Sequence, residues 1–77
     1  MSCLICAGQA ESIECSSGWE QRQCAVCGCY RMSQDLILAM MEEGQIFDTV
    51  RMREWLMANR SLVPVPCIDH PQAILMP

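Results

Sequence analysis

The chain has 77 residues, among them seven cysteines, seven methionines and five arginines, with no lysine and a formal net charge of −4. This length predicts a single domain spanning residues 1–77, and a core of that size rarely supplies more than about 3–5 kcal/mol of net stability without a disulfide or a metal. The missing lysine excludes Schiff-base chemistry and a P-loop lysine, and the negative charge disfavours nucleic acid and favours basic protein partners.

The cysteines predict a metal site in a reducing compartment. Their number would suit a secreted disulfide scaffold, but seven is odd, and the first residues lack the basic flank and apolar run of a signal peptide. The longest apolar run, Leu36 to Met41, is far shorter than the roughly 20 residues that cross a bilayer. We therefore expect a cytoplasmic protein without a membrane segment, whose thiolates bind metal.

Three zones of different composition divide the expected domain. Residues 1–32 hold six of the seven cysteines and alternate polar and apolar positions, as short strands do. Residues 33–60 hold no cysteine and are typical of helix. Residues 61–77 hold all four prolines, so we expect this tail to be extended.

The first zone predicts a β-hairpin and a third short strand. Residues 11–15 alternate, which places Ile13 and Cys15 on one face of a strand. Residues 16–18 supply a turn, and residues 19–23 return as the second strand, with Trp19 packed over the hairpin. We expect the third strand from Tyr30 to Met32.

The second zone predicts two helices. Ser33 is an N-cap and Gly44 ends the first helix, whose packed face carries Leu36, Ile37, Met40 and Met41. The second helix begins near Asp48 or Thr49 and carries Met52, Trp55 and Leu56 on one face and Val50 and Met57 on the other. This helix is therefore covered on both sides or leaves an apolar face for a partner.

Two C-x2-C pairs in the first zone predict a metal centre. Cys3 and Cys6 form the first pair, and Cys24 and Cys27 form the second after seventeen intervening residues. Two residues between thiolates let both sulfur atoms reach one metal ion, and two such pairs complete a tetrahedron. This is the spacing of four-cysteine zinc sites. We call residues 3–8 the first knuckle and residues 24–28 the second knuckle.

These motifs, Cys3-Leu4-Ile5-Cys6-Ala7-Gly8 and Cys24-Ala25-Val26-Cys27-Gly28, resemble the paired knuckles of the zinc-ribbon family. The resemblance covers about residues 3–32 and implies one structural Zn²⁺ per chain, with Cys3, Cys6, Cys24 and Cys27 as its ligands. The whole chain is loosely similar to short bacterial and phage proteins with a ribbon ahead of two helices, which implies a bacterial or phage-infected host cytoplasm. Gly8 and Gly28 stand where a tight turn needs a positive φ.

The other cysteines and the only histidine have weaker interpretations. We expect Cys15 to be a small packed residue, and Cys29 is a spare thiol close to the site. Cys67 and His70 have ligand-like spacing, but a lone pair in a proline-rich tail is expected to be incidental. An iron–sulfur cluster or a thioredoxin-type motif requires other spacings or a helix start, so both are disfavoured.

The charged residues favour solvated surfaces. The arginines at 51, 53 and 60 are expected on a solvated helix face rather than along a phosphate backbone. Clustering of these three with Arg22 and Arg31 would favour nucleic-acid binding instead. The acids at 35, 42, 43 and 48 lie around the helix junction, where we expect them to favour solubility. The alternative is that they form a docking surface for a basic partner.

Together these features predict a small metal-stabilised α+β fold: a zinc-ribbon hairpin with three short strands, two helices and an extended proline-rich tail. Four thiolates leave no open position on the metal, so we expect no enzyme but a protein-interaction module or small regulator with a structural zinc. The alternatives are a nucleic-acid-binding zinc ribbon and a small acidic, phage-type inhibitor of a host defence or nucleic-acid enzyme. Homo-oligomerisation stays open.

Overall fold

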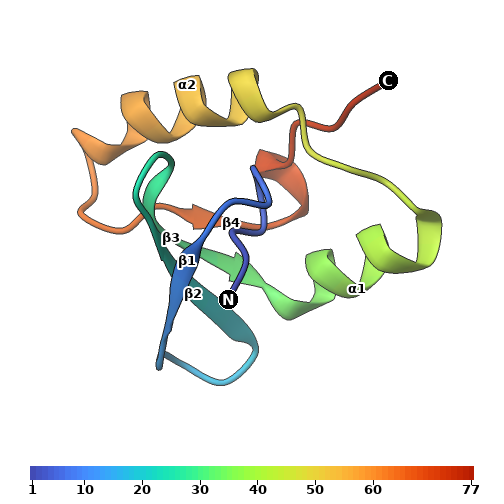
Figure 1. Cartoon of the computed structure of the whole chain (residues 1–77), viewed down its shortest axis with the longest axis horizontal. Coiled ribbons are helices and arrows are strands. Elements are labelled where there is room, and N and C mark those ends of the chain that lie inside the picture. The colour runs from blue at the N-terminus through green and yellow to red at the C-terminus, as the bar shows by residue number, and fades with distance from the viewer.

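Four short strands form one sheet, and two helices follow the first three of them along the chain (Figure 1). The computed structural model describes all residues, 1–77. The strands lie in the order β1 (Ala10–Ile13), β2 (Trp19–Cys24), β3 (Gly28–Ser33) and β4 (Cys67–Ile68). β2 is antiparallel to both β1 and β3, and β4 runs parallel to β3. The helices are α1 (Gln34–Glu43) and α2 (Thr49–Arg60). The predicted small α+β fold is confirmed.

The hairpin of β1 and β2 forms where the alternating residues predict it, with shifted ends. β1 already ends at Ile13, so Cys15 lies in the connecting turn, where its thiol donates a hydrogen bond to the carbonyl oxygen of Trp19 at 3.3 Å. Gly18 has a φ of 86°, which L side chains rarely adopt, and lets the chain reverse into β2.

β3 is longer than the expected segment from Tyr30 to Met32. It starts at Gly28, which pairs with Cys24, and runs to Ser33. The strand extends because β2 offers pairing partners along its whole length. Tyr30 and Met32 alternate toward the interior and are both fully buried, so β3 carries the centre of the core.

Helix α1 begins and ends at the predicted residues. Ser33 Oγ accepts a hydrogen bond from the backbone N–H of Leu36 at 3.1 Å, and Gly44, with a φ of 65°, ends the helix. Leu36 and Met40 are buried as predicted. Met41, which was expected on the packed face, is instead 74% exposed, because it lies beside the i, i+4 stripe that reaches the core.

Helix α2 has two apolar faces, of which one is covered. Asp48 caps the helix by accepting a hydrogen bond from a backbone N–H in its first turn. Met52 and Leu56 are fully buried, whereas Val50 and Met57 on the other face are exposed. The prediction that α2 either is covered on both sides or leaves an apolar face is thus resolved in favour of an uncovered face.

The tail of residues 61–77 differs from the expected extended segment, because it contains β4 and a 3₁₀ helix at His70–Gln72 that Asp69 caps. The chain then returns to the linker between the helices, where Phe47 forms an isolated bridge with Leu75. A two-residue strand has no periodicity of its own, so its sequence carries no signal for β4.

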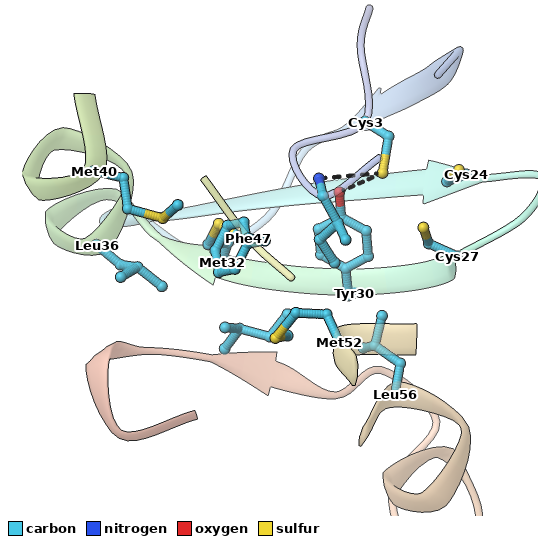
Figure 2. Packing of buried hydrophobic residues seen from close by; sticks show 12 residues of the cluster. Cys3, Cys24, Cys27, Tyr30, Met32, Leu36, Met40, Phe47, Met52 and Leu56 are labelled. Carbon is cyan, nitrogen blue, oxygen red and sulfur yellow. Dashed lines mark hydrogen bonds between the residues drawn. The ribbon is translucent and has the colours of Figure 1, made fainter. Parts of the chain in front are cut away.

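The core lies between the sheet and the two helices (Figure 2). Its largest fully buried side chains are those of Tyr30, Met32, Met52, Leu56, Pro66 and Ile68. Cys3, Cys24 and Cys27 belong to the same buried cluster, so the cysteine motifs stand at one end of the core. Neither α1 nor α2 combines the length and the apolar character that spanning a bilayer requires.

Candidate metal centre

The structure brings the four cysteines of the two knuckles together. The sulfur atoms of Cys3, Cys6, Cys24 and Cys27 all lie within 4.8 Å of one another, and no other group of three or more potential ligands occurs in the chain. The sheet register explains this convergence. Ala10 at the start of β1 pairs with Cys24 at the end of β2, so the residues just before β1 lie beside the second knuckle.

The second knuckle forms the turn that joins β2 to β3. Gly28, its last residue, has a φ of 86°, as the sequence predicts. The Arg60 side chain at the end of α2 donates hydrogen bonds to the carbonyl oxygens of Cys27 at 2.9 Å and Cys29 at 3.2 Å. A Cβ atom on Gly28 would lie only 2.5 Å from that guanidinium. Glycine is therefore required here both for its backbone conformation and for the close approach of Arg60.

The first knuckle is a tight loop closed by its own backbone. The N–H of Cys3 donates to the carbonyl oxygen of Gly8 at 2.6 Å, and the N–H of Ala7 donates to that of Cys3 at 3.1 Å. The positive φ falls on Ala7, at 61°, and not on Gly8 as predicted. Gly8 serves a different need, because a Cβ atom there would lie 3.3 Å from the sulfur of Cys6.

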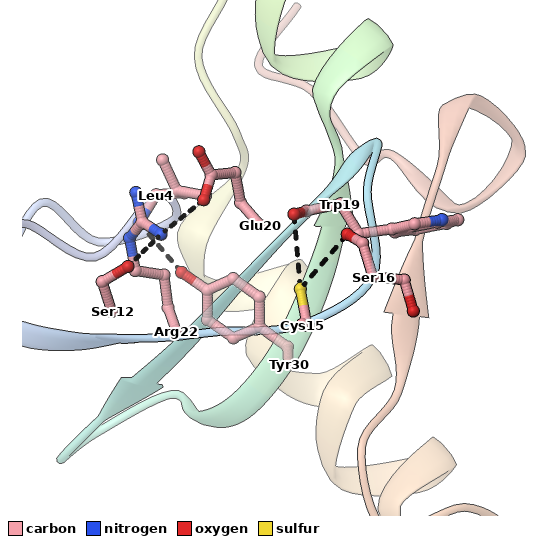
Figure 3. Close-up of polar contacts among 8 residues, drawn as sticks. All are labelled: Leu4, Ser12, Cys15, Ser16, Trp19, Glu20, Arg22 and Tyr30. Carbon is pink, nitrogen blue, oxygen red and sulfur yellow. Dashed lines mark hydrogen bonds and ion pairs between the residues drawn. The ribbon is translucent and has the colours of Figure 1, made fainter.

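Tyr30 connects the first knuckle to β3. Its hydroxyl accepts a hydrogen bond from the N–H of Leu4 at 2.9 Å and lies 3.0 Å from the sulfur of Cys3 (Figures 2 and 3). Either group can donate in the contact between the hydroxyl and the sulfur, but where Cys3 is a thiolate the hydroxyl is the only possible donor. Burial raises the pKa of Tyr30 above its usual value, so this proton stays in place.

Arg53 of α2 lies next to the sulfur cluster. The sulfur atoms of Cys27 and Cys6 raise the pKa of its guanidinium. Its Nε atom is buried without a hydrogen-bond partner, while the side chain as a whole is half-buried. Four thiolates around a divalent cation carry a net charge of −2, which this guanidinium partly balances.

The thiols of Cys6 and Cys27 have opposite pKa shifts. The backbone N–H of Gly8 is the main cause that lowers the pKa of Cys6, to about 6, whereas burial raises the pKa of Cys27 to about 12. Without a cation the buried Cys27 therefore keeps its proton. A bound metal ion displaces such a proton, so metal binding here is coupled to proton release.

The residues present fit a tetrahedral metal ion. A zinc ion about 2.3 Å from each of four sulfur atoms separates those atoms by about 3.8 Å. The observed distance between the sulfur atoms of Cys6 and Cys24 is 3.7 Å. A disulfide needs about 2.05 Å, and all seven cysteines are free. The distance between Cys6 and Cys24 thus matches a tetrahedral metal site, and all four sulfur atoms lie close enough together to hold one metal ion.

The remaining candidate residues lie outside this cluster. Cys29 accepts a hydrogen bond from the side-chain amide of Gln21 at 3.3 Å, and Cys15 contacts backbone carbonyls in the β1–β2 turn. Cys67 is exposed on β4, and His70 starts the 3₁₀ helix. Neither belongs to a group of three or more potential metal ligands. No third ligand joins the Cys67 and His70 pair.

Most arginines have partners inside the chain. The side chains of Arg22, Arg31, Arg53 and Arg60 contact acceptors or sulfur atoms, and that of Arg51 forms no hydrogen bond or ion pair. Figure 3 shows Arg22 between Ser12 and Glu20. Sequence reasoning assigned Arg53 and Arg60 to a solvated face. Their spacing of seven residues, which returns to the same side of a helix after two turns, was the available signal that they act together.

No protein-family model, no curated protein and no solved structure matches the chain.

Proposed function

We propose that the chain is a zinc ribbon that acts as a non-catalytic protein-interaction module, with one structural Zn²⁺ bound by Cys3, Cys6, Cys24 and Cys27. The observation that carries this proposal is the convergence of four sulfur atoms within 4.8 Å. Four thiolates fill the coordination sphere of zinc, so no position remains for water or substrate. Zinc binding contributes about 10–16 kcal/mol in comparable peptides, more than a core of this size supplies alone.

The surface supports a binding role. Large apolar side chains stay exposed on both helices: Leu38 and Met41 on α1, and Val50 and Met57 on α2. Leu38 and Met41 lie three residues apart and Val50 and Met57 seven apart, so each helix presents a pair of apolar side chains on one side, as helices that bind a partner do. The net charge of −4 favours a partner with a basic surface.

The contacts of the arginine side chains disfavour the alternative function, nucleic-acid binding. Four of the five have intramolecular partners, which leaves few cationic groups for phosphates. A mobility shift at about 50 mM salt that disappears by about 200 mM would support the alternative. Absence of a shift at low salt removes it. An inhibitor of a host enzyme is a special case of protein binding and is tested by the same search for partners.

Native mass spectrometry of protein purified under reducing conditions tests the zinc site and the oligomeric state together. We expect one zinc per chain. Cys24→Ser should lose both the metal and the fold, whereas Cys29→Ser, which changes a nearby thiol outside the cluster, should keep both. A metal-free folded protein, or paired disulfides in place of metal, would contradict the proposal.

Proximity labelling in the cell of origin tests the interaction role. The native chain and Cys29→Ser should label the same partner proteins, and the unfolded Cys24→Ser should not. Identical labelling by all three forms would show that no folded surface is recognised, which would overturn the interaction role while leaving the zinc site intact.

A further inference from the structure

An apolar groove lies between the first knuckle and the linker that joins the helices. Its volume is about 400 Å³, and ten of its twelve lining residues are hydrophobic. Met32 of β3 and Met40 of α1 line it from the core side, as Figure 2 shows beside Phe47. Leu4 and Ile46 line it from the knuckle and the linker. The groove therefore reaches from the protein surface to the centre of the core.

Two large apolar side chains at this groove remain in water. Met41 is 74% exposed and Ile46 is 65% exposed, although both line it. Transfer of such a side chain from water into an apolar contact is favourable. Methionine side chains adapt to differently shaped partners, which suits a groove with Met32, Met40 and Met41 in its wall. These residues gain stability only when something covers them.

The charges next to the groove do not serve the fold. Glu42 and Glu43 follow Met41 in the last turn of α1, where no basic residue accompanies them. The negative end of the helix dipole lies there, so acidic side chains at this position are unfavourable. Neither forms an ion pair, because the chain has a single one, between Arg22 and Glu20. Glu42 and Glu43, which we call the acidic rim, do not line the groove but stand in the chain between Met41 and Gly44, which do. Their position favours a cation beside the groove.

We propose that the groove binds a basic segment of a partner protein, one with two or three apolar anchor residues flanked by arginine or lysine. The inference rests on the proposed interaction function and names its surface. The anchors enter the groove beside Met41 and Ile46, and the flanking cations meet Glu42 and Glu43. A second copy of this chain is a poorer occupant, because it brings the same net charge of −4 to an acidic rim.

Selection from a phage-displayed library of random 16-residue peptides, at about 150 mM salt on the zinc-loaded protein, tests the proposal. Enriched peptides should combine apolar anchors with flanking basic residues. Ile46→Arg should weaken their binding by at least about tenfold. Leu62→Arg is the matched control, because Leu62 is 80% exposed and does not line the groove; it should leave binding within about twofold.

A second pair of variants tests whether the acidic rim contributes to peptide binding. Glu42→Gln with Glu43→Gln should weaken binding by about fivefold and flatten its salt dependence. Glu11→Gln with Glu14→Gln removes the same charge from exposed positions around β1 and should have a smaller effect. Equal effects of the two pairs would mean that net charge alone attracts the peptides, which would overturn the proposed rim.

The remaining outcomes separate this inference from the proposed function. Native mass spectrometry of each variant confirms that zinc is retained. If the peptides bind Ile46→Arg and Leu62→Arg equally well, the groove is wrong and the interaction function stands. Absence of any enriched peptide overturns the groove, while the labelling experiment still tests the function. A dimer in sedimentation that Ile46→Arg dissociates would replace the basic segment with a second copy.

Discussion

The two knuckles present the same pair of sulfur atoms, but the fold supports them differently. The second knuckle closes the long ladder between β2 and β3, and Arg60 holds its carbonyl groups from α2. The first knuckle precedes the sheet, and an isolated bridge between Ser2 and Gln9 closes it on itself. Its hydrogen bonds to the rest of the fold are few: Ala10 of β1 donates to the carbonyl oxygen of Met1 at 2.7 Å, and the hydroxyl groups of Tyr30 and Thr49 contact the loop. The comparison indicates that the sheet itself builds the second knuckle, whereas the first knuckle depends on a few contacts outside the strand ladders.

Metal removal has the largest expected effect, because chelation removes binding energy on the order of 10 kcal/mol, more than the core supplies alone, and should unfold the chain. The division between the knuckles is tested with zinc bound. Backbone amides of residues 2–9 should exchange through local opening, and therefore faster than amides of β2 and β3. Residue-resolved hydrogen exchange by NMR measures the two rates, with the chelated protein as the unfolded reference. Equal protection of the two knuckles would contradict the division.

Gly28→Ala should be the most damaging single change in the second knuckle outside its cysteines. The new Cβ would lie 2.5 Å from the Arg60 guanidinium, at a backbone φ of 86°. Strain and the displaced hydrogen bonds together should cost about 3 kcal/mol in the free energy of unfolding, measured by urea denaturation with zinc present.

Gly18→Ala is the matched control, because Gly18 has the same φ of 86° with nothing within 4 Å of its added Cβ. It should cost only the conformational strain, about 1–2 kcal/mol. If the two glycine variants are equally destabilised, Arg60 contributes nothing to the second knuckle.

Tyr30→Phe should weaken the first knuckle by about 2 kcal/mol. The change removes the hydroxyl that accepts from Leu4 N–H and contacts Cys3, and it leaves the half-buried N–H of Leu4 without a partner. Urea denaturation measures the loss, and hydrogen exchange should place it in residues 2–9. A uniform effect across the sheet would assign Tyr30 to general core packing instead.

Arg53 tests whether one side chain supports both knuckles, because a sulfur atom from each knuckle raises the pKa of its guanidinium. Arg53→Gln should weaken zinc affinity by about tenfold, since groups that hydrogen-bond metal ligands have effects of this size. Competition with a chromophoric chelator measures the affinity. Arg51→Gln removes the same charge from the same helix, at a side chain without a partner, and should leave zinc affinity nearly unchanged. Equal effects would indicate long-range attraction only.

The sequence predicts those parts of the fold that depend on interactions between residues close together in the chain. The C-x2-C pairs, the Ser33 cap and the Gly44 end are local signals, and the structure contains all of them. The contact of Tyr30 with Leu4 joins residues 26 positions apart, and that of Arg60 with Cys27 joins residues 33 apart. Periodicity and spacing carry no information about such contacts.

The convergence of the four cysteines was predictable from the sequence, and the contacts that support them were not. Spacing alone singled out these cysteines, because two residues between thiolates let both sulfur atoms reach one metal ion. β4 was missed because its pairing with β3 is set by the tail returning to the sheet, a tertiary event that two residues cannot encode. Gly8 was expected to have a positive φ, but that conformation falls on Ala7, and an added Cβ at Gly8 would instead make a tight contact of 3.3 Å with the sulfur of Cys6.

Ala7 provides the smallest expected effect and the sharpest contrast between the knuckles. It is the only non-glycine residue with a positive φ, at 61°, a conformation that costs an L residue about 1–2 kcal/mol. Ala7→Gly relieves this cost but gives the unfolded chain more freedom, so it should stabilise the protein by about 0.5–1 kcal/mol. Ala25→Gly, at an exposed position of the second knuckle without positive φ, should destabilise it by about 0.5 kcal/mol. Opposite signs in urea denaturation would show that strain resides in the first knuckle alone. If both variants are destabilised, the positive φ of Ala7 costs the folded protein no measurable backbone strain.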